Sequence, residues 1–257
     1  MKISLSAIVV TRNEEKNIRR CLESLRWVDE IVVVDQSSSD KTVSICQEYT
    51  DKVFVVANKG YCEPDRPVAC AKARNSWVLY LDADEEVSSQ LRDEIEVLFF
   101  SNPTYTCYYV PRKNIFLKKW IRGSGWYPGY VLRLFKKGAV GFSEKIHTDL
   151  FPKAACGYLQ QPLIHYTAER WEEYLAKSSR YTDILAQQEL QKGKRVTLFN
   201  LAFKLFFLPL AYCLQKYILK KGFIDGWHGV LIAYLTFLTV FKMNLKLLNT
   251  PREQSHG

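Results

Sequence analysis

The sequence lacks the cysteine pairs and the glycine-rich loops that identify several large classes of protein. Its seven cysteines are scattered and odd in number, and no two of them form a Cys-x-x-Cys pair. This pattern argues against a disulfide framework or a zinc site and favours a reducing compartment. The chain also has no Gly-x-Gly-x-x-Gly and no Walker-type Gly-Lys-Ser/Thr motif. Dinucleotide-binding and P-loop proteins are therefore excluded, and any phosphate bound here needs a metal ion or basic side chains.

The N-terminal residues lack the apolar core of a signal peptide. A strand-like run over residues 3–10 meets Arg12, Asn13 and Glu14 before it reaches the length of a signal sequence. We therefore expect the chain to start and stay in the cytosol. A chain of 257 residues, 47% of them hydrophobic, is long enough for one large core or a core with an appendage.

The net charge of +9 is unevenly distributed along the chain. Residues 111–145 carry nine Lys/Arg against one Asp/Glu, and residues 190–249 carry the same nine against one. Basic blocks of this kind indicate phosphate-bearing partners, which are a nucleic acid, an anionic membrane or a phosphorylated substrate. The blocks contain no recognised nucleic-acid motif and flank an acidic half, so we expect no nucleic-acid partner.

Strand-like and helix-like segments alternate over the first hundred residues. Short and almost wholly apolar runs predict four strands, at 3–10, 30–35, 53–56 and 77–81. Apolar residues at helical spacing predict helices between them, the first opening at Thr11. Strands that are apolar throughout are buried on both faces, so this half is expected to be a parallel α/β sheet of nucleotide-binding type.

The fourth predicted strand ends in a group of acids. Asp82 and Asp84 are two residues apart, so on an extended chain their side chains converge. Two carboxylates held together need a cation between them, and oxygen ligands of this kind suit Mg²⁺ or Mn²⁺. The alternative is a solvated helix N-terminus, in which Glu85 and Glu86 interact favourably with the helix dipole.

Other polar residues also follow predicted strand ends. Thr11, Asn13 and Glu14 come after the first strand, and Asp35 closes the second. Taken singly, each is more readily explained as a helix cap. Open α/β sheets bind ligands beyond the carboxyl ends of their strands, so together with the acids these residues predict one binding crevice.

Residues 104–151 change in character. Two predicted strands, 105–110 and 130–135, flank a basic loop that contains Trp126 and Tyr127. These rings are candidates for stacking against a sugar, with ordinary packing as an equally good alternative.

Three polar residues of the same region are further candidates for a site. Arg133, in the second of these strands, is placed to reach a diphosphate or to pair with a surface acid. His147 and Asp149 lie two apart on an extended stretch and so face the same side. They are a candidate metal ligand and a candidate base.

The C-terminal region combines apolar and basic residues. An amphipathic helix is predicted over 168–191, followed by apolar runs at 196–214 and 229–241. The first run is interrupted by polar residues and a proline, and the second, at 13 residues, is too short to span a bilayer core of ~30 Å. Helices lying on the cytoplasmic face of an anionic membrane are the favoured interpretation, and a helical cap packed on the α/β body is the alternative.

Taken together, the motifs resemble those of the inverting family 2 glycosyltransferases. The most specific are in the N-terminal half: Thr11-Arg12-Asn13-Glu14-Glu15, Asp29–Asp35, Ser39-Asp40-x-Thr42 and Leu81–Glu85. Later stretches are similar to the bacterial lipopolysaccharide inner-core β-1,4-glucosyltransferases: Gly125-Trp126-Tyr127-Pro128, Arg133–Phe135, Ile146-His147, His165, Lys177, Tyr181 and Gly222–Gly226. The resemblance covers residues 3–245.

This resemblance implies a GT-A fold, which is a Rossmann-like α/β nucleotide-diphospho-sugar transferase fold with a mixed sheet. We expect the GT-A domain over 1–165, with a nucleotide-sugar half (1–103) and an acceptor half (104–165). An amphipathic helical region that associates with membranes would follow over 166–257. The resemblance further implies a UDP-sugar donor, Mg²⁺ or Mn²⁺, and a lipid-linked saccharide acceptor at the cytoplasmic face of the inner membrane.

The resemblance also implies roles for individual residues. The positions that hold uridine and ribose are matched by Thr11, Asn13, Glu14 and Asp35. The aspartate pair that holds the metal and the donor is matched by Asp82 and Asp84. Apart from these matches, His147 stays a candidate ligand and Arg133 a candidate for the diphosphate on the grounds of their positions alone. Trp126 and Tyr127 are the candidates for the acceptor.

Two departures from the subfamily pattern concern the catalytic base. The subfamily commonly has His-Glu where this chain has His147-Thr148, and Asp where this chain has Gly129. We therefore assign the base to Asp149, with Glu144 as the second choice. The rival interpretations are a transferase that acts on a polyprenyl phosphate or another glycolipid, and a catalytically silent, membrane-bound GT-A-like binding module.

Overall fold

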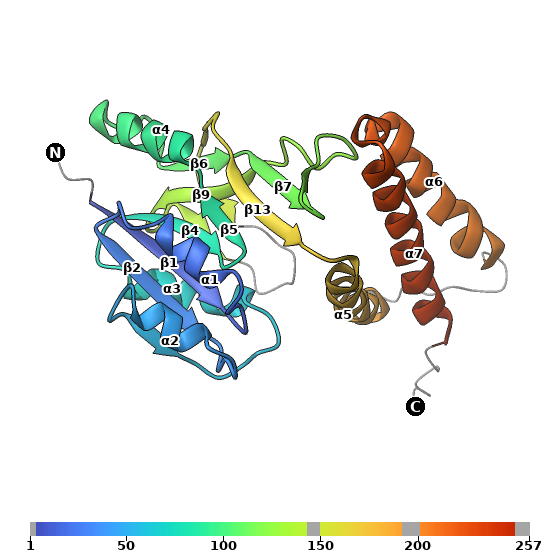
Figure 1. Ribbon diagram of the computed structural model, residues 1–257, viewed down its shortest axis with the longest axis horizontal. Helices are drawn as coiled ribbons and strands as arrows, with labels where there is room; N and C mark the ends of the chain where they lie inside the picture. Colours follow the sequence, from blue (N-terminus) through green and yellow to red (C-terminus); the bar gives the residue numbers. More distant parts are fainter. Residues whose placement is uncertain (1–3, 143–149, 192–200, 250–257) are drawn as a thin grey trace. The chain divides into compact units, whose positions relative to one another are not determined.

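The computed structural model describes residues 4–142, 150–191 and 201–249 and divides into two compact units (Figure 1). The first unit comprises Met1–Asn114 and Pro128–Tyr166, and the second comprises Ile115–Tyr127 and Thr167–Gly257. The domain boundary expected after residue 165 lies beside the last residue of the first unit. The loop Ile115–Tyr127, which the sequence placed in the acceptor half, belongs instead to the second unit.

A seven-stranded mixed sheet forms the centre of the first unit, in the order β12-β6-β9-β4-β1-β2-β3. Four strands are mutually parallel: β1 (Leu5–Thr11), β2 (Glu30–Asp35), β3 (Val53–Val55) and β4 (Trp77–Asp82). The antiparallel strand β9 (Val131–Lys136) separates β4 from β6 (Cys107–Val110), and β12 (Gly157–Tyr158) pairs with β6 at the edge. The parallel arrangement predicted for the first hundred residues is thus present, with β9 inserted antiparallel.

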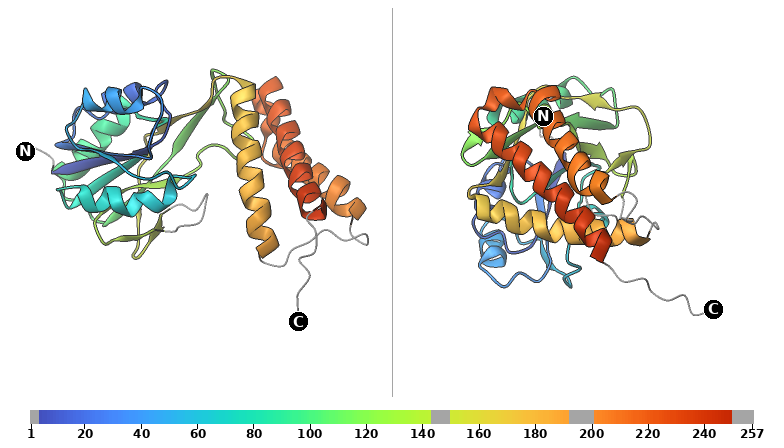
Figure 2. Two further views of the ribbon diagram at one scale, coloured as in Figure 1. Left: turned by 90° about the horizontal axis from the view of Figure 1, so that it is seen from below. Right: turned by 90° about the vertical axis from the view of Figure 1, so that its right-hand side faces the viewer.

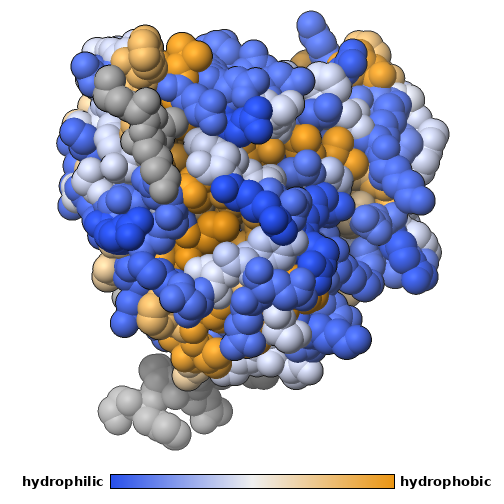
Figure 3. All heavy atoms as spheres, turned by 60° about the vertical axis from the view of Figure 1, so that its left-hand side comes forward, coloured by the Kyte–Doolittle hydropathy of each residue, from blue (hydrophilic) through white to orange (hydrophobic). Residues whose placement is uncertain are grey.

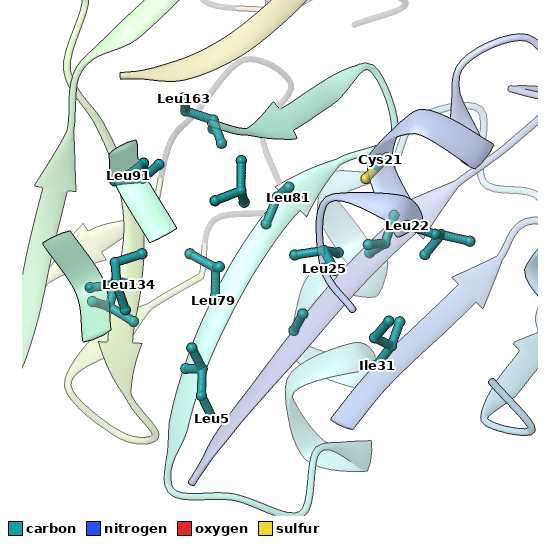
Figure 4. Close-up of a cluster of buried hydrophobic side chains, with 14 of the residues drawn as sticks. Leu5, Cys21, Leu22, Leu25, Ile31, Leu79, Leu81, Leu91, Leu134 and Leu163 are labelled. Carbon is teal, nitrogen blue, oxygen red and sulfur yellow. The ribbon is translucent and has the colours of Figure 1, made fainter. Parts of the chain in front are cut away.

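Apolar side chains fill both faces of this sheet, as the unbroken apolar runs predict. On one face, leucines from the strands pack against α1 (Ile18–Glu23), α2 (Thr42–Gln47) and α4 (Ser89–Phe100). Figure 4 shows this cluster, to which Leu5 and Leu79 of the strands, Leu22 of α1 and Leu91 of α4 all belong. The other face packs against α3 (Arg66–Lys72), which follows the short 3-10 helix η1 (Glu63–Asp65).

The first helix begins later than the sequence predicts. It was expected to open at Thr11, whereas α1 starts at Ile18. Asn13 adopts a left-handed backbone with φ of 52°, a conformation that asparagine tolerates better than most residues but that interrupts a helix. The polar residues after β1 therefore lie in a loop at the strand end.

Two smaller sheets complete the strands. β5 (Glu85–Val87), β13 (Leu163–Ala168), β7 (Arg112–Phe116) and β8 (Lys119–Trp120) form a four-stranded sheet in that order, and β10 (Val140–Gly141) pairs with β11 (Phe151–Pro152). The placement of Glu85 and Glu86 in β5 shows that they are not the first turn of a helix, so that interpretation of the acids was wrong. The following helix, α4, is capped by Ser88, whose hydroxyl accepts a hydrogen bond from Leu91 N at 3.1 Å.

The second unit is mainly helical. It contains α5 (Trp171–Gln191), α6 (Leu208–Leu214) and α7 (Trp227–Asn249), with π-helical turns η3 (Phe203–Phe207) and η4 (Gln215–Leu219) on either side of α6 and a 3-10 turn η5 (Gly222–Asp225) before α7. Figure 2 shows α6 and α7 in orange and red, and α7 packs against both α5 and α6. The core of this unit lies around Phe116, Ile232 and Leu235.

Large apolar side chains are exposed on both units. Figure 3 shows one face of the molecule, on which hydrophobic groups, in orange, appear in patches among hydrophilic ones in blue. In the second unit the exposed apolar residues are concentrated on the helical segments between 203 and 234: Phe203, Phe206, Phe207, Leu210, Tyr212, Leu214, Ile218, Leu219, Phe223, Ile224, Trp227, Val230 and Tyr234. We call this set the apolar helical face.

The last helix is longer than the apolar run that predicted it. The most apolar 18-residue stretch within residues 227–248 of α7 has a mean hydropathy of 1.5, and only 28% of that stretch is buried. By length and composition alone this helix is sufficient to cross a membrane. The expectation that the C-terminal runs are too short for a span therefore does not hold for α7.

Candidate functional site

The register of the parallel strands brings several predicted site residues together at the C-terminal ends of these strands. Thr11, the last residue of β1, lies opposite Asp35, the last residue of β2, and Val10 lies opposite Asp82, the last residue of β4. The antiparallel strand β9 begins at the same end, two residues before Arg133. We call this group (Thr11, Asp35, Asp82, Asp84 and Arg133) the strand-end site.

Arg133 forms an ion pair with two acids of this site. Its Nη2 donates to Asp82 Oδ2 at 2.5 Å and to Glu85 Oε1 at 2.8 Å. The arginine is only 2% exposed, and Glu85 is fully buried between Arg133 and Arg112, whose Nη1 lies 3.7 Å from Glu85 Oε1. Of the two possibilities that the sequence left open for Arg133, the structure shows pairing with acids, of which Glu85 is buried and Asp82 is half-buried.

Asp82 has two further partners that the sequence did not reveal. The Tyr80 hydroxyl donates a hydrogen bond to Asp82 Oδ1, and Arg66 Nη2 lies 4.0 Å from the same oxygen. Arg66 Nε also donates to the Tyr80 hydroxyl at 3.0 Å. Tyr80 was detectable in principle, because it precedes Asp82 by two residues in a strand. Arg66 was not, because it reaches the site from the start of α3.

The charges around Asp82 set the protonation states of the site. Burial by itself works to raise the pKa of Asp82, but Arg133 and then Arg66 outweigh it, so the pKa lies below its ordinary value. Burial, together with the charge of Asp82, raises the pKa of Tyr80 well above its ordinary value. Near neutral pH Asp82 is therefore an anion and Tyr80 is a protonated donor.

Asp84 faces a histidine from a distant part of the chain. Its Oδ2 lies 3.4 Å from His165 Nε2 in β13, and the other ring nitrogen, Nδ1, lies 2.7 Å from Asn114 Oδ1. When Nδ1 is protonated and donates the hydrogen bond to Asn114 Oδ1, Nε2 is unprotonated and presents a lone pair to the Asp84 carboxylate. Two electron-pair donors so placed need a proton or a cation between them. The sequence singled out His165 only through the family resemblance, with no role.

These two residues are the described ones best suited to hold a metal ion. Within the described ranges no cluster of three or more His, Cys, Asp and Glu has a metal-binding arrangement. Mg²⁺ is commonly bound through one or two protein carboxylates with substrate phosphates completing its ligands, so Asp84 with His165 fits such an ion. Asp82, already paired with two arginines, fits less well. His147 lies outside the described residues.

The residues predicted to bind a nucleoside tie two loops together. Asp35 accepts hydrogen bonds from Ser38 N at 2.8 Å and from Ser38 Oγ at 2.5 Å. Asn13 Oδ1 accepts from Ser39 N, and Glu14 N donates to Thr42 Oγ1, both at 2.8 Å. The loops after β1 and β2 thus form one polar rim.

One member of this rim has a polar atom without a partner. The Thr11 hydroxyl is buried and has no hydrogen-bond partner in the described part of the chain. Thr11, Asn13, Glu14 and Asp35 therefore lie together, as the sequence predicted, while the contacts of Asn13 and Asp35 also serve the local fold.

The two aromatic residues proposed for the acceptor are packed within the second unit. The Trp126 ring lies 5.6 Å from that of Phe116, edge to face, and packs, partly buried, against the core of that unit. The Tyr127 ring lies 5.2 Å from that of Trp120. Both show the ordinary packing that was the alternative interpretation. The two candidate bases, Asp149 and Glu144, lie outside the described residues.

A cavity of about 520 Å³ lies elsewhere in the first unit. It is lined by residues of α1, of the loop that follows α1, of β5 and of the start of α4, among them Arg20, Trp27 and Arg92. No residue of the strand-end site lines it. This cavity is therefore not part of the candidate site, which is identified by the residues that converge at the strand ends.

Comparison with known proteins links this geometry to one family. The model of the family described as glycosyl transferase family 2 matches residues 6–165. The lipopolysaccharide core biosynthesis glycosyltransferase LpsC of Rhizobium meliloti (strain 1021) is 28% identical over 261 residues, covering 94% of this chain and 93% of LpsC. An uncharacterized glycosyltransferase, RT0209, of Rickettsia typhi is 28% identical, covering 93% of this chain and 86% of that protein.

Solved structures show the same fold. The crystal structure of S. aureus TarS 1-349 in complex with UDP superposes with a TM-score of 0.51 at 16% identity, covering 94% of this chain and 89% of that one. The TarS 1-349 structure in complex with UDP-GlcNAc gives a TM-score of 0.50. The GT-A fold with its mixed sheet, expected from the sequence, is confirmed by this likeness. The narrower β-1,4-glucosyltransferase resemblance is not.

Proposed function

This chain belongs to glycosyl transferase family 2, and from that premise we propose that it moves a hexose, glucose in the first instance, from a UDP-sugar to a saccharide of the lipopolysaccharide core. The proposed acceptor is lipid-linked and is used at the cytoplasmic face of the inner membrane. The name and the nearly full-length match of LpsC support a role in core biosynthesis. The complexes of TarS with UDP and UDP-GlcNAc support a UDP-sugar donor.

The proposal is supported above all by two groups that converge at the C-terminal ends of the parallel strands. One is the polar rim, and the other is the arginine–acid group, which comprises Arg133, Arg66, Asp82 and Glu85. The uridine would lie against the rim, where Thr11 has an unpaired hydroxyl and Asp35 a buried carboxylate. The diphosphate would then reach Asp84, Arg133 and Arg66. Ligands of open α/β sheets bind at this end of the strands.

Transfer with inversion requires two things of the protein. The acceptor hydroxyl must lose a proton as it attacks the anomeric carbon, and the departing UDP must be stabilised as an anion. Arg133 and Arg66, fixed by Asp82, Glu85 and Tyr80, supply positive charge that does not have to reorganise during the reaction. A divalent cation, Mg²⁺ or Mn²⁺, when held by Asp84 and His165, would neutralise charge on the leaving diphosphate. The base that we propose is Asp149, with Glu144 as the second choice.

Membrane association is part of the proposal. The thirteen large side chains of the apolar helical face include Leu219 at 75% exposed and Phe207 at 63%. Lys216, Lys220 and Lys221 lie in or just after η4 within the same segment. Apolar residues next to lysines are typical of helices that bind the surface of an anionic membrane. Such binding would bring the enzyme to a lipid-linked acceptor.

A donor and acceptor screen tests the function. Purified protein is incubated with UDP-glucose, UDP-galactose and their N-acetylated analogues, with and without Mn²⁺, and UDP release is measured. Product masses are then determined with lipid A-core and with polyprenyl phosphate as acceptors. We expect hydrolysis of one donor and transfer to lipid A-core. Transfer only to polyprenyl phosphate would favour that rival.

Asp84→Asn is the matched variant for this screen. It keeps the size of the side chain but removes the charge that faces His165. We expect Mn²⁺ binding to the UDP-loaded protein, measured by calorimetry, to weaken by at least about tenfold. The rate of donor hydrolysis should fall as well. A wild-type protein that neither binds UDP nor hydrolyses any donor would support the silent binding module instead.

A further inference from the structure

Three tyrosines form an exposed aromatic ledge beside the strand-end site. Tyr109 is in β6, Tyr158 is in β12, and Tyr130 comes immediately before β9. The rings of Tyr109 and Tyr158 are stacked, 5.2 Å apart at 18°, and the Tyr130 ring meets that of Tyr158 edge to face at 5.1 Å. Tyr158 is 56% exposed and Tyr130 is 38% exposed. The ledge therefore presents aromatic surface and hydroxyl groups to solvent.

The ledge lies at the same end of the strands as Asp82. Because β9 is antiparallel to β4, the start of β9, next to Tyr130, is at the end of β4 that carries Asp82. Val110, the last residue of β6, pairs with Val131, and Tyr158 pairs with Tyr109. From β4 to β12 there are three strand steps of about 4.8 Å each, or roughly 14 Å. A short oligosaccharide covers such a span.

The ledge also lies on the same face of the sheet as the arginine–acid group. Tyr80 and Leu132 belong to the apolar cluster that packs against α3, and Tyr109 packs against that cluster. Asp82 alternates with Leu81 and so faces the same side as Tyr80, where Arg66 of α3 approaches it. The ledge and the group that would hold the donor diphosphate therefore lie at the same end of the strands and on the same face of the sheet.

We propose that Tyr130 and Tyr158, backed by Tyr109, bind a sugar ring of the acceptor saccharide. The inference rests on the proposed function. A tyrosine ring offers an apolar surface to the C–H face of a sugar, and its hydroxyl donates or accepts a hydrogen bond at the ring edge. The ring stacked beneath Tyr158 is held by cross-strand pairing, so little side-chain freedom is lost on binding.

Leucine variants test the ledge, with Tyr105 as the matched control. Tyr105 is 42% exposed and also packs edge to face on a tyrosine, Tyr108, but it precedes β6, at the opposite end from Val110. We expect Tyr158→Leu and Tyr130→Leu to raise the KM for deacylated core oligosaccharide about tenfold, the effect of ~1.4 kcal/mol. Donor hydrolysis without acceptor, UDP binding and the melting temperature should be unchanged. Tyr158→Phe should keep most of the affinity, and Tyr105→Leu all of it.

Several outcomes would overturn the assignment. These are an unchanged KM in both leucine variants, an equal rise in Tyr105→Leu, or a rise accompanied by an equal loss of donor hydrolysis or of thermal stability. Direct titration of core oligosaccharide into wild type and Tyr158→Leu by calorimetry separates this inference from the function on which it rests. Wild type that hydrolyses the donor but binds oligosaccharide no better than Tyr158→Leu refutes only the ledge. Wild type that neither binds UDP nor hydrolyses a donor refutes the transferase function.

Discussion

At the scale of single residues, the strand-end site depends on Arg133. This buried guanidinium is the shared partner of Asp82, which is half-buried, and of Glu85, which is withdrawn from water. Isolated buried charges are far more costly than paired ones. The same contact holds Asp82 in its anionic form and keeps a positive charge at the edge of the sheet.

Replacing Arg133 by methionine tests this dependence. Removing one partner of a buried ion pair costs about 3–5 kcal/mol, and we expect a loss of that size in the free energy of unfolding by urea. Arg112→Met is the matched control, since its guanidinium lies 3.7 Å from Glu85 and its side chain is 30% exposed; its loss should stay below about 1 kcal/mol. Equal losses in the two variants would show that Arg133 is not the principal partner.

Glu30, the first residue of β2, lies at the opposite end of the parallel strands from the strand-end site. Its ionisation leads to a prediction of how stability depends on pH. Its buried carboxylate accepts hydrogen bonds from Ser6, Lys52 and Arg74 N. Burial works to raise its pKa, but Lys52, Ser6 and the Arg74 amide outweigh it, so the pKa lies below its ordinary value. A lowered pKa means that the ionised form contributes stability above the pKa of the unfolded chain, about 4.3, and that this stability is lost as the pH falls through the folded value.

We therefore expect Glu30→Gln to be less stable than wild type by about 1–3 kcal/mol at pH 7. The difference should shrink as the pH is lowered from about 5 toward 3. Urea unfolding of both proteins across this range gives the measurement. A difference that stayed constant down to pH 3 would mean that ionisation of Glu30 does not contribute.

At the scale of elements, two glycine-containing motifs of the sequence meet in one clasp. The Asp225 carboxylate in η5 accepts from Gly123 N at 2.7 Å and from Arg122 N at 3.1 Å, and Lys119 Nζ donates to the Asp225 carbonyl at 2.7 Å. A Cβ on Gly123 would lie 2.3 Å from the Lys221 carbonyl oxygen. The loop over Ile115–Tyr127 and the turn before α7 are thus joined by hydrogen bonds between side chains and backbone, and their backbones approach so closely at Gly123 that no side chain fits there.

Asp225→Ala should destabilise the second unit. It removes the acceptor of two backbone N–H groups, and of these the Gly123 N–H is buried, so that leaving it unpaired costs about 1–3 kcal/mol. Asp225→Asn keeps one acceptor oxygen and should lose about half as much. Hydrogen exchange is the suitable measurement, because it reports loss of protection at Arg122 and Gly123 directly. Unchanged protection at both amides in Asp225→Ala would contradict the clasp.

At the scale of the whole molecule, the apolar helical face predicts how the full chain partitions. We expect the protein to float with vesicles that contain phosphatidylglycerol, and Leu219→Glu with Phe207→Glu to reduce the bound fraction severalfold. Both positions are exposed in the second unit, so a charge there opposes insertion. Phe100→Glu is the matched control, because Phe100 is 80% exposed but lies in α4 of the first unit.

Equal loss of binding in Phe100→Glu would contradict the assignment of the membrane surface to the helical face. Extraction with alkaline carbonate then distinguishes two modes of attachment. Release into the supernatant supports helices that lie on the surface. Retention would show that α7, which is long and apolar enough to cross a bilayer, spans it.

Local sequence patterns were enough to predict the parallel strands, their burial and the gathering of polar residues at their ends. Unbroken apolar runs such as that of β4 are read directly from neighbouring residues, and Asp82 follows the run by one position. Apolar periodicity was less informative after Thr11, where the conformation of Asn13 delays the helix to Ile18. The acids after β4 also gave no local sign that a short strand, β5, would follow.

The side chains that the acids contact depend instead on how distant segments pack together. Arg133 lies 51 positions from Asp82, and His165 reaches Asp84 from β13, far along the chain. The tyrosine ledge likewise unites residues of three segments through strand pairing. Periodicity describes which face of its own element a residue occupies, whereas the order and register of strands fix which element lies beside it. That order depends on the free energy of packing the whole chain, and no local pattern contains it.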